Sequence, residues 1–197
     1  MIRVAGLVLA GGRGSRLGGV DKPLLQVGGA PILARVIDAL RPEVRWLAIS
    51  ANGDPTRFAG FGAPVLPDGD TAGEGPLAGL CAGLAWAAGL GAELVLTAPG
   101  DTPFLPSGLL GSLAPPPSFA ARAGVDHPLV ALWPVTVLDR LRAVLSAPGS
   151  RAVAGFAREI GMRRAEFPAS GADPFMNVNT PDDLATARAM AENPRWT

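Results

Sequence analysis

Cysteine, histidine and lysine each occur only once in this chain of 197 residues. The single cysteine, Cys81, excludes an internal disulfide framework and a zinc site built from several thiolates. Seventeen basic and seventeen acidic side chains cancel, so no overall field attracts nucleic acid or an anionic membrane. No apolar run approaches the about 20 residues of a membrane-spanning helix, and the N-terminus lacks a signal-peptide pattern. We therefore expect a cytoplasmic protein that binds neither nucleic acid nor membrane.

The one lysine, Lys22, lies in a glycine-rich stretch that runs from Leu9 to Pro23. The apolar run Val4–Leu9 before it predicts a buried strand. Because the other basic residues are all arginines, a lysine here suggests a place for a compact ammonium. Glycines let backbone N–H groups approach an anion, and Arg16 and Lys22 add positive charge. The stretch predicts a phosphate-binding loop, with a purely structural strand–helix turn as the alternative.

Predicted strands and helices alternate over the first hundred residues. Apolar runs predict strands over 4–9, 46–49, 63–66 and 94–98, and helices are predicted over 31–40 and 76–88. Such alternation implies parallel strands joined by right-handed crossovers. We therefore expect an α/β fold with three layers, α/β/α, around a mostly parallel, Rossmann-like sheet, in one domain over 1–197.

The second half of the chain predicts a hairpin followed by helices. Two strands over 118–123 and 128–133 place His127 near the hairpin turn, and helices over 136–145 and 150–160 precede a strand over 163–167. Thr180, Pro181 and Asp183 then form a helix-start signal, for a helix that ends near residue 192. Asn177 and Asn179 alternate just before it, so in an extended segment their amides face the same way.

Polar residues gather where predicted strands end, which is where an open parallel sheet binds ligands. Asn52, Asp68 and Asp101 each follow such a strand. A lone carboxylate at a strand tip suits a divalent metal, although aspartate is also common in turns and helix caps. With a phosphate loop predicted at the same edge, metal binding by Asp101 is favoured. For His127, a surface or hydrogen-bonded turn residue is the simpler interpretation.

Six motifs lie in order between Leu9 and Pro181, across almost the whole chain. They are Leu9-Ala10-Gly11-Gly12 with Arg16, Gly18-Gly19-Val20-Asp21-Lys22, Gly75-Pro76-Leu77-Ala78-Gly79, Asp101-Thr102-Pro103, Asp126-His127-Pro128 and Asn177-Val178-Asn179-Thr180-Pro181. Together they resemble the molybdenum cofactor guanylyltransferase family, within the nucleotidyltransferases of the glycosyltransferase-A-like fold. The first motif indicates only this superfamily, whereas the last two are the more specific for the family.

The resemblance implies transfer of GMP from GTP to molybdopterin, or to its molybdenum-loaded form, with release of pyrophosphate. It implies Mg²⁺ at Asp101, or Mn²⁺ in its place, and transient contact with proteins that handle molybdopterin. It also implies a nucleotide half over about 1–104 and an acceptor half over about 105–197. The implied catalytic residues are Arg16, Lys22 and Asp101; the GTP-binding residues are Leu9, Ala10, Gly11, Gly12, Lys22, Asn52, Asp68 and Asp101; and the pterin-side residues are Gly79, Asp126, His127, Asn177 and Asn179.

One position departs from the family pattern, and three other functions compete. Ser50 stands where the family often has an asparagine, and a serine cannot reproduce the paired hydrogen bonds of an amide. A related nucleotidyltransferase that uses CTP, or acts on a sugar phosphate or phospholactate, is the nearest alternative. A dinucleotide-binding oxidoreductase fits less well, because Gly18 comes one residue late for the glycine fingerprint after Gly12-x-Gly14. A non-catalytic module is the third, and the presence of Arg16, Lys22 and Asp101 argues against it.

Overall fold

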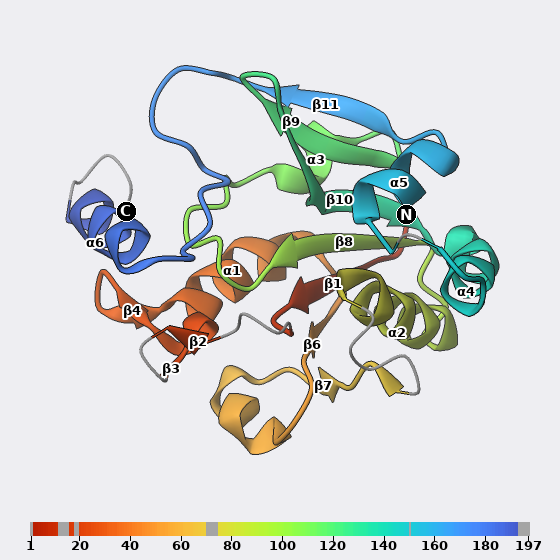
Figure 1. Cartoon of the computed structure of the whole chain (residues 1–197), viewed down its shortest axis with the longest axis horizontal. Helices are drawn as coiled ribbons and strands as arrows, with labels where there is room; N and C mark the ends of the chain where they lie inside the picture. Colours follow the sequence, from red (N-terminus) through yellow and green to blue (C-terminus); the bar gives the residue numbers. More distant parts are fainter. Residues whose placement is uncertain (1, 12–15, 18–19, 70–74, 150, 193–197) are drawn as a thin grey trace.

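The central element of the computed structural model is a seven-stranded sheet with the strand order β11-β9-β10-β8-β1-β6-β7 (Figure 1). The structure describes residues 2–11, 16–17, 20–69, 75–149 and 151–192, with only the backbone of residues 16, 17 and 20. The strands of this sheet are β1 (Val4–Leu9), β6 (Trp46–Ser50), β7 (Val65–Leu66), β8 (Leu94–Pro99), β9 (Ser118–Arg122), β10 (Val125–Pro134) and β11 (Arg163–Phe167). Two small ribbons pair β2 (Arg16–Leu17) with β3 (Val20–Asp21) and β4 (Gln26–Val27) with β5 (Ala30–Pro31).

Four of the six neighbouring strand pairs are parallel, which confirms the expected mostly parallel sheet. The strand β1 pairs in parallel with β6 and β8, β6 with β7, and β11 with β9. The strand β10 pairs antiparallel with both β8 and β9. The predicted hairpin is therefore present, and it extends the sheet beyond β8.

The α-helices in the described parts of the chain form two groups, and each group contributes to an apolar core on one side of the sheet. Apolar residues of α1, α3 and α6 pack on one face and those of α2, α4 and α5 on the other. Side chains of β1 alternate between these two cores, with Val4 and Val8 on one side and Leu7 and Leu9 on the other. This is the predicted three-layer α/β/α arrangement. The helices are α1 (Ile32–Leu40), α2 (Pro76–Gly89), α3 (Leu109–Leu113), α4 (Leu138–Ser146), α5 (Val153–Glu159) and α6 (Pro181–Ala191).

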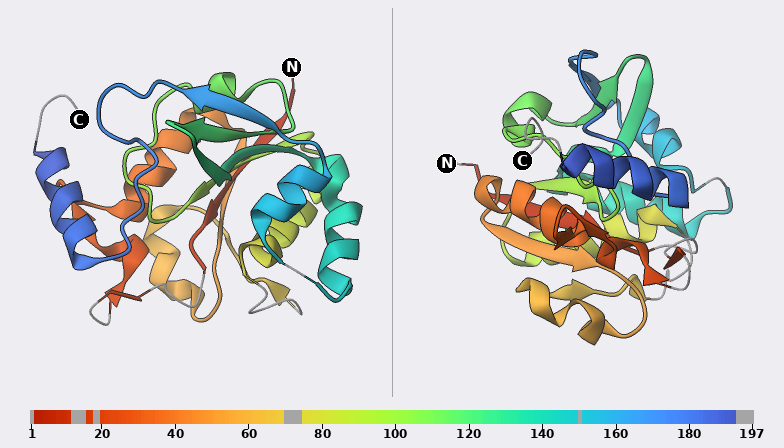
Figure 2. Two further views of the ribbon diagram at one scale, coloured as in Figure 1. Left: turned by 45° about the horizontal axis from the view of Figure 1, so that its top comes forward. Right: turned by 90° about the vertical axis from the view of Figure 1, so that its left-hand side faces the viewer.

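The last helix, α6, lies beside the N-terminal part of the chain. In both views of Figure 2 it is next to the orange-red segment that carries β4, which it contacts. Its start follows the predicted signal, because the Thr180 hydroxyl accepts from the Asp183 N–H and the Asp183 carboxylate accepts from the Thr180 N–H. Within the described parts of the chain, no helix is long and apolar enough to cross a membrane.

The parallel strands end at one level, and this alignment creates the site. Leu9, the last residue of β1, pairs with Ser50 of β6 on one side and with Pro99 of β8 on the other. The chain runs from β1 outward to β6 and β7 and then returns across β1 to form β8. Such a reversal of strand order at the carboxyl ends of parallel strands opens a crevice that binds ligands.

Candidate active site

The first loop leaves β1 at the centre of this edge. The Ala10 N–H donates to the Ser50 carbonyl over 2.8 Å, and the Gly100 N–H donates to the Leu9 carbonyl over 2.9 Å. The strand end is thus held from both sides, and Gly11 is exposed beyond it. Of the residues expected to bind GTP here, Leu9, Ala10 and Gly11 lie at the edge, whereas Gly12 and the side chain of the catalytic candidate Arg16 fall outside what the structure describes.

Asn52 and Asp68 meet next to this loop, from the ends of β6 and β7. The Asn52 Nδ2 donates to Asp68 Oδ2 over 2.7 Å, and the Asp68 N–H donates to Asn52 Oδ1 over 3.0 Å. The Ser50 hydroxyl donates to the other carboxylate oxygen, Asp68 Oδ1, over 3.3 Å. The Ser50 hydroxyl is therefore hydrogen-bonded within the protein. It helps to orient the carboxylate that Asn52 also holds.

Gly79, expected on the pterin side, lies against this same group. It is buried in the first turn of α2, and a Cβ there would overlap the Ser50 hydroxyl and lie 3.3 Å from Asp68 Oδ1. The absence of a side chain lets α2 approach the ends of β1 and β6 closely. The neighbours of Gly79 are thus residues of the expected nucleotide side.

The charge of Lys22 acts on Asp101, the carboxylate that follows the end of β8. Burial raises the pKa of the Asp101 carboxyl above its ordinary value, and the positive charge of Lys22 opposes that rise. The Lys22 ammonium donates to Asn179 Oδ1 over 2.8 Å. The structure therefore brings together the expected phosphate-binding lysine, the expected metal ligand and one expected pterin-side amide.

The segment that carries the two asparagines is attached to the loop after β8. The Val178 N–H donates to the Asp101 carbonyl over 2.9 Å, and the buried Thr102 hydroxyl donates to Asn177 Oδ1 over 2.8 Å. Val178 is fully buried whereas Asn177 and Asn179 are exposed, which agrees with the expectation that the two asparagines lie on the same side of the segment. Thr102 thus belongs to the site, although neither composition nor spacing pointed to this residue individually.

His127, expected on the pterin side, lies in β10. Its ring contacts Phe175 with centroids 4.9 Å apart, and burial lowers the pKa of the imidazole, partly offset by Asp173 and Asp126. The imidazole is therefore harder to protonate than an ordinary histidine. The neighbouring Asp126 carboxylate is exposed and accepts from Arg164 Nε over 2.7 Å, so it forms an ion pair on the surface of the hairpin.

Arg122 organises the loop that carries Phe175, a role for which no motif in the sequence is a signal. Its Nη2 donates to the carbonyls of Ala169 and Gly171 over 2.8 Å each, and its Nε donates to that of Pro168 over 3.0 Å. Backbone acceptors from Pro168 to Ala172 on one guanidinium fix the curve of the chain between β11 and Phe175. This curve sets the position of Phe175 against His127.

The donor set at Asp101 fits a hard divalent cation. Mg²⁺ is commonly bound through one or two carboxylates, with water and substrate phosphates as its other ligands. Among the residues that the structure describes, no three His, Cys, Asp or Glu side chains gather into a closed metal site. Asp101 is a half-buried carboxylate whose anionic form is disfavoured by burial, so a cation beside it would relieve an existing cost.

Comparisons with known proteins identify the family of this chain. Residues 6–160 match the MobA-like NTP transferase domain. A molybdenum cofactor guanylyltransferase of Acidiphilium cryptum is 51% identical over 183 residues, which cover 93% of each chain. This chain belongs to that family. The resemblance of its motifs is thereby confirmed, as is the expectation of a nucleotidyltransferase enzyme.

Solved structures of the same fold are more distant in sequence. Molybdopterin-guanine dinucleotide biosynthesis protein A from Archaeoglobus fulgidus has a TM-score of 0.73 at 20% identity, with 95% of this chain and 98% of that chain covered. A Mycobacterium tuberculosis protein in complex with manganese has a TM-score of 0.67 at 20% identity, with 95% and 98% covered. These likenesses confirm the nucleotidyltransferase fold of this guanylyltransferase family member.

Proposed function

We propose that this chain transfers GMP from GTP to the terminal phosphate of molybdopterin, or of its molybdenum-loaded form. The reaction forms molybdopterin guanine dinucleotide and releases pyrophosphate. The observation that carries the proposal is the hydrogen bond from the Lys22 ammonium to Asn179 Oδ1, at a place where the positive charge of Lys22 also acts on the Asp101 carboxyl. A phosphate-binding cation, a carboxylate for a divalent metal and an acceptor-side amide are thereby assembled at one point.

The nucleotide lies along the first loop in this proposal. The backbone of Leu9, Ala10 and Gly11 faces the base and ribose, and Asn52 and Asp68 contact the nucleoside from the neighbouring strand ends. The mutual hydrogen bonds of Asn52 and Asp68 support this role, since they hold both side chains in one orientation before a ligand arrives. Gly12 and Arg16 of the same loop are proposed to bind and neutralise the phosphates.

The transfer itself needs no nucleophile from the protein. An oxygen of the pterin phosphate attacks the α-phosphorus of GTP, a new P–O bond forms, and the bond to the β-phosphate oxygen breaks as pyrophosphate leaves. Lys22 stabilises the negative charge around the α-phosphorus, and Asp101 is the residue that would hold a divalent metal. Mg²⁺, or Mn²⁺ in its place, would polarise the phosphate oxygens when bound. The chain contributes positioning and electrostatic stabilisation.

The acceptor side is proposed to use His127, Asp126, Asn177 and Asn179. Thr102 and the Asp101 carbonyl hold the asparagine segment in place, which supports a fixed amide surface for a polar pterin. The proposed halves are residues 1–104 for the nucleotide and 105–197 for the acceptor. Gly79 packs against Ser50 and Asp68, so we propose that it shapes the nucleotide side. Because GTP and molybdopterin are the proposed substrates, we place the reaction in the cytoplasm, with transient delivery of molybdopterin by another protein.

Nucleotide binding is the first test of the proposal. A ligand that binds only the folded state raises the melting temperature by mass action. We expect GTP with Mg²⁺ to raise the melting temperature of the purified protein, and CTP, ATP and NADPH to raise it much less. A preference for CTP would reassign the substrate within the same fold, and a shift with NADPH alone would contradict the proposal.

A further inference from the structure

Arg57 reaches from one short helical segment to two loops that carry proposed substrate-binding residues. It lies on η3 (Pro55–Phe61), between β6 and β7. Its Nη1 is 2.7 Å from Asp21 Oδ2, and its Nη2 donates to the Asn52 carbonyl over 2.8 Å. We propose that Arg57 is a positioning residue that fixes Asp21 and the adjacent Lys22 relative to Asn52, an inference that rests on the proposed function.

The guanidinium is held by its own segment on the side away from those loops. Its Nε donates to the Asp54 carbonyl over 3.1 Å, and its Cζ lies 4.8 Å from the centre of the Phe58 ring. Phe58 is buried in the core, and the Asp54 side chain caps η3 through the Thr56 N–H. The segment therefore presents the fork of the guanidinium in one orientation, with Nη1 and Nη2 pointing to different partners.

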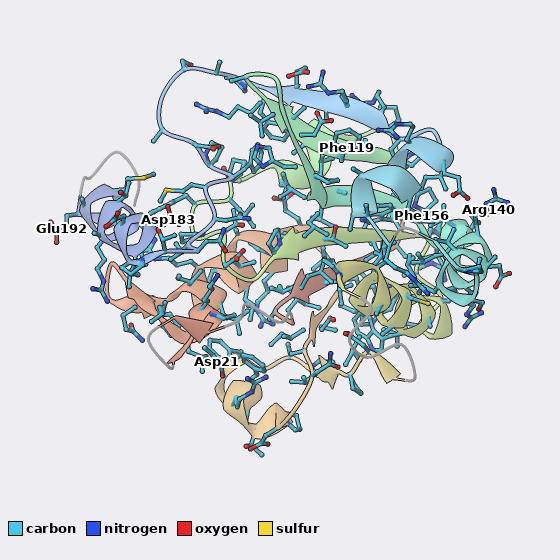
Figure 3. All side chains as sticks on the ribbon, in the orientation of Figure 1. Asp21, Phe119, Arg140, Phe156, Asp183 and Glu192 are labelled. Carbon is cyan, nitrogen blue, oxygen red and sulfur yellow. The ribbon has the colours of Figure 1, made fainter. Side chains whose placement is uncertain are left out.

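The Arg57–Asp21 pair is mostly buried, so its geometry is strongly fixed. The two side chains are 25% and 11% exposed. An ion pair in such a place resists separation, because each charge left alone would be poorly solvated. Figure 3 shows Asp21 directly beside the gold helical segment that contains Arg57. A lysine in place of Arg57 would keep the charge but lacks a planar fork for donating to Asp21 and Asn52 together.

One partner of Arg57 is adjacent to a proposed phosphate contact, and the other is hydrogen-bonded to a proposed nucleoside contact. Asp21 directly precedes Lys22, the proposed phosphate ligand, and Asn52 holds Asp68, a proposed nucleoside contact, through two hydrogen bonds. Arg57 therefore sets the spacing between the phosphate contact and the nucleoside contact. An error of about 1 Å in such spacing can lower the rate about a hundredfold.

The test compares Arg57→Ala and Arg57→Lys with Arg41→Ala. Arg41 is a matched control, since its Nη2 donates to the Phe61 carbonyl at the other end of the same segment, over 3.1 Å. We expect Arg57→Ala to lower kcat/KM for GTP about 10- to 100-fold, and Arg41→Ala to stay within about twofold of the wild type. Compared with Arg57→Ala, the variant Arg57→Lys should restore the melting temperature more fully than it restores kcat/KM. Free guanidinium, below concentrations that change the melting temperature, should restore part of the activity of Arg57→Ala.

A double-mutant cycle with Asp21→Asn separates positioning from folding. If Arg57 acts through Asp21, the double variant Asp21→Asn/Arg57→Ala should lose little more kcat/KM than Arg57→Ala alone. Should Arg57→Ala fail to fold, Asp21→Asn/Arg57→Met removes both charges and keeps apolar packing, so it should fold and remain impaired. Wild-type kcat/KM in any folded Arg57 variant, or fully additive losses, would overturn the inference. Failure of the proposed function would instead appear in the wild type, as absence of GTP use.

Discussion

The Lys22 ammonium donates a hydrogen bond to Asn179 Oδ1 over 2.8 Å, across a sequence separation of 157 residues. The lysine follows the glycine-rich loop, and the asparagine lies on the acceptor segment just before α6. The contact therefore joins the two proposed halves of the site. Because a phosphate is a stronger acceptor for an ammonium than a neutral amide, we expect bound GTP to compete with Asn179 for Lys22.

Removal of either charged group at the strand ends should abolish most of the activity. We expect Lys22→Ala and Asp101→Ala each to lower turnover by about a hundredfold or more, as loss of a preorganised electrostatic partner does elsewhere. Steady-state rates at saturating GTP measure this. Arg140→Ala is the control, because Arg140 is exposed on α4 and pairs with Glu159, far from the strand ends in Figure 3. A near-normal rate in a folded variant would remove that residue from the mechanism.

The charged form of Asp101 should lower the stability of the fold when no substrate is bound. Burial raises the pKa of its carboxyl above the ordinary 3.8, so the folded state disfavours the charged form. The protonated carboxyl therefore favours the folded state. This contribution to the free energy of unfolding is fully present below pH 3.8 and is lost as the pH rises through the raised pKa. We therefore expect Asp101→Asn to melt at a higher temperature than the wild type at neutral pH without metal. The difference should disappear in acid; an equal difference at all pH values would contradict this origin.

Substitution of His127 should raise KM for molybdopterin more than KM for GTP. We expect His127→Ala to raise KM for molybdopterin several-fold while KM for GTP stays within about twofold, because the ring lies on β10 beside Phe175. His127→Phe keeps an aromatic ring at this contact and removes the polar nitrogens, so it separates packing from hydrogen bonding. Equal losses for both substrates would contradict the assignment of His127 to the acceptor side.

Gly79 should tolerate no side chain, although it lies in a helix. A Cβ at this position overlaps the Ser50 hydroxyl, so we expect Gly79→Ala to destabilise the fold by about 1–3 kcal/mol and to weaken GTP binding. Gly89→Ala is a control on the same helix, because a Cβ there meets nothing within 4 Å. Denaturant titration compares the two variants. Ser50→Ala should relieve the overlap, so no recovery in the Gly79→Ala/Ser50→Ala double variant would contradict this explanation.

Local patterns predicted the elements of this fold well. The apolar run Val4–Leu9 has the bounds of β1, and the Thr180 and Asp183 signal is the capping box of α6. The helix predicted from residue 150 begins only at Val153, because Ala152 is its extended N-cap residue. Boundaries of this kind depend on backbone conformation at single positions, which periodicity does not resolve.

The contacts between distant segments were beyond the reach of sequence patterns. The positions of Asn52, Asp68 and Asp101 after predicted strands indicated that they share an edge of the sheet. They did not indicate the hydrogen bonds that Asn52 and Asp68 exchange. Arg57 is one of sixteen arginines and lies in no motif. Its partner Asp21 is 36 positions away, too far for a local pattern to indicate the pair. Which arginine meets which carboxylate is decided by the packing of the whole chain. Such pairs emerge only once the strands and loops are placed in space.

The most direct test of the central claim is the transfer reaction itself. Purified protein is incubated with molybdopterin, Mg²⁺ and either GTP or CTP, and both pyrophosphate and the dinucleotide product are measured. We predict one pyrophosphate for each molybdopterin guanine dinucleotide formed, with GTP strongly preferred and neither product formed without molybdopterin. Product from CTP in preference to GTP, or no dinucleotide from a protein that binds GTP, would contradict the account.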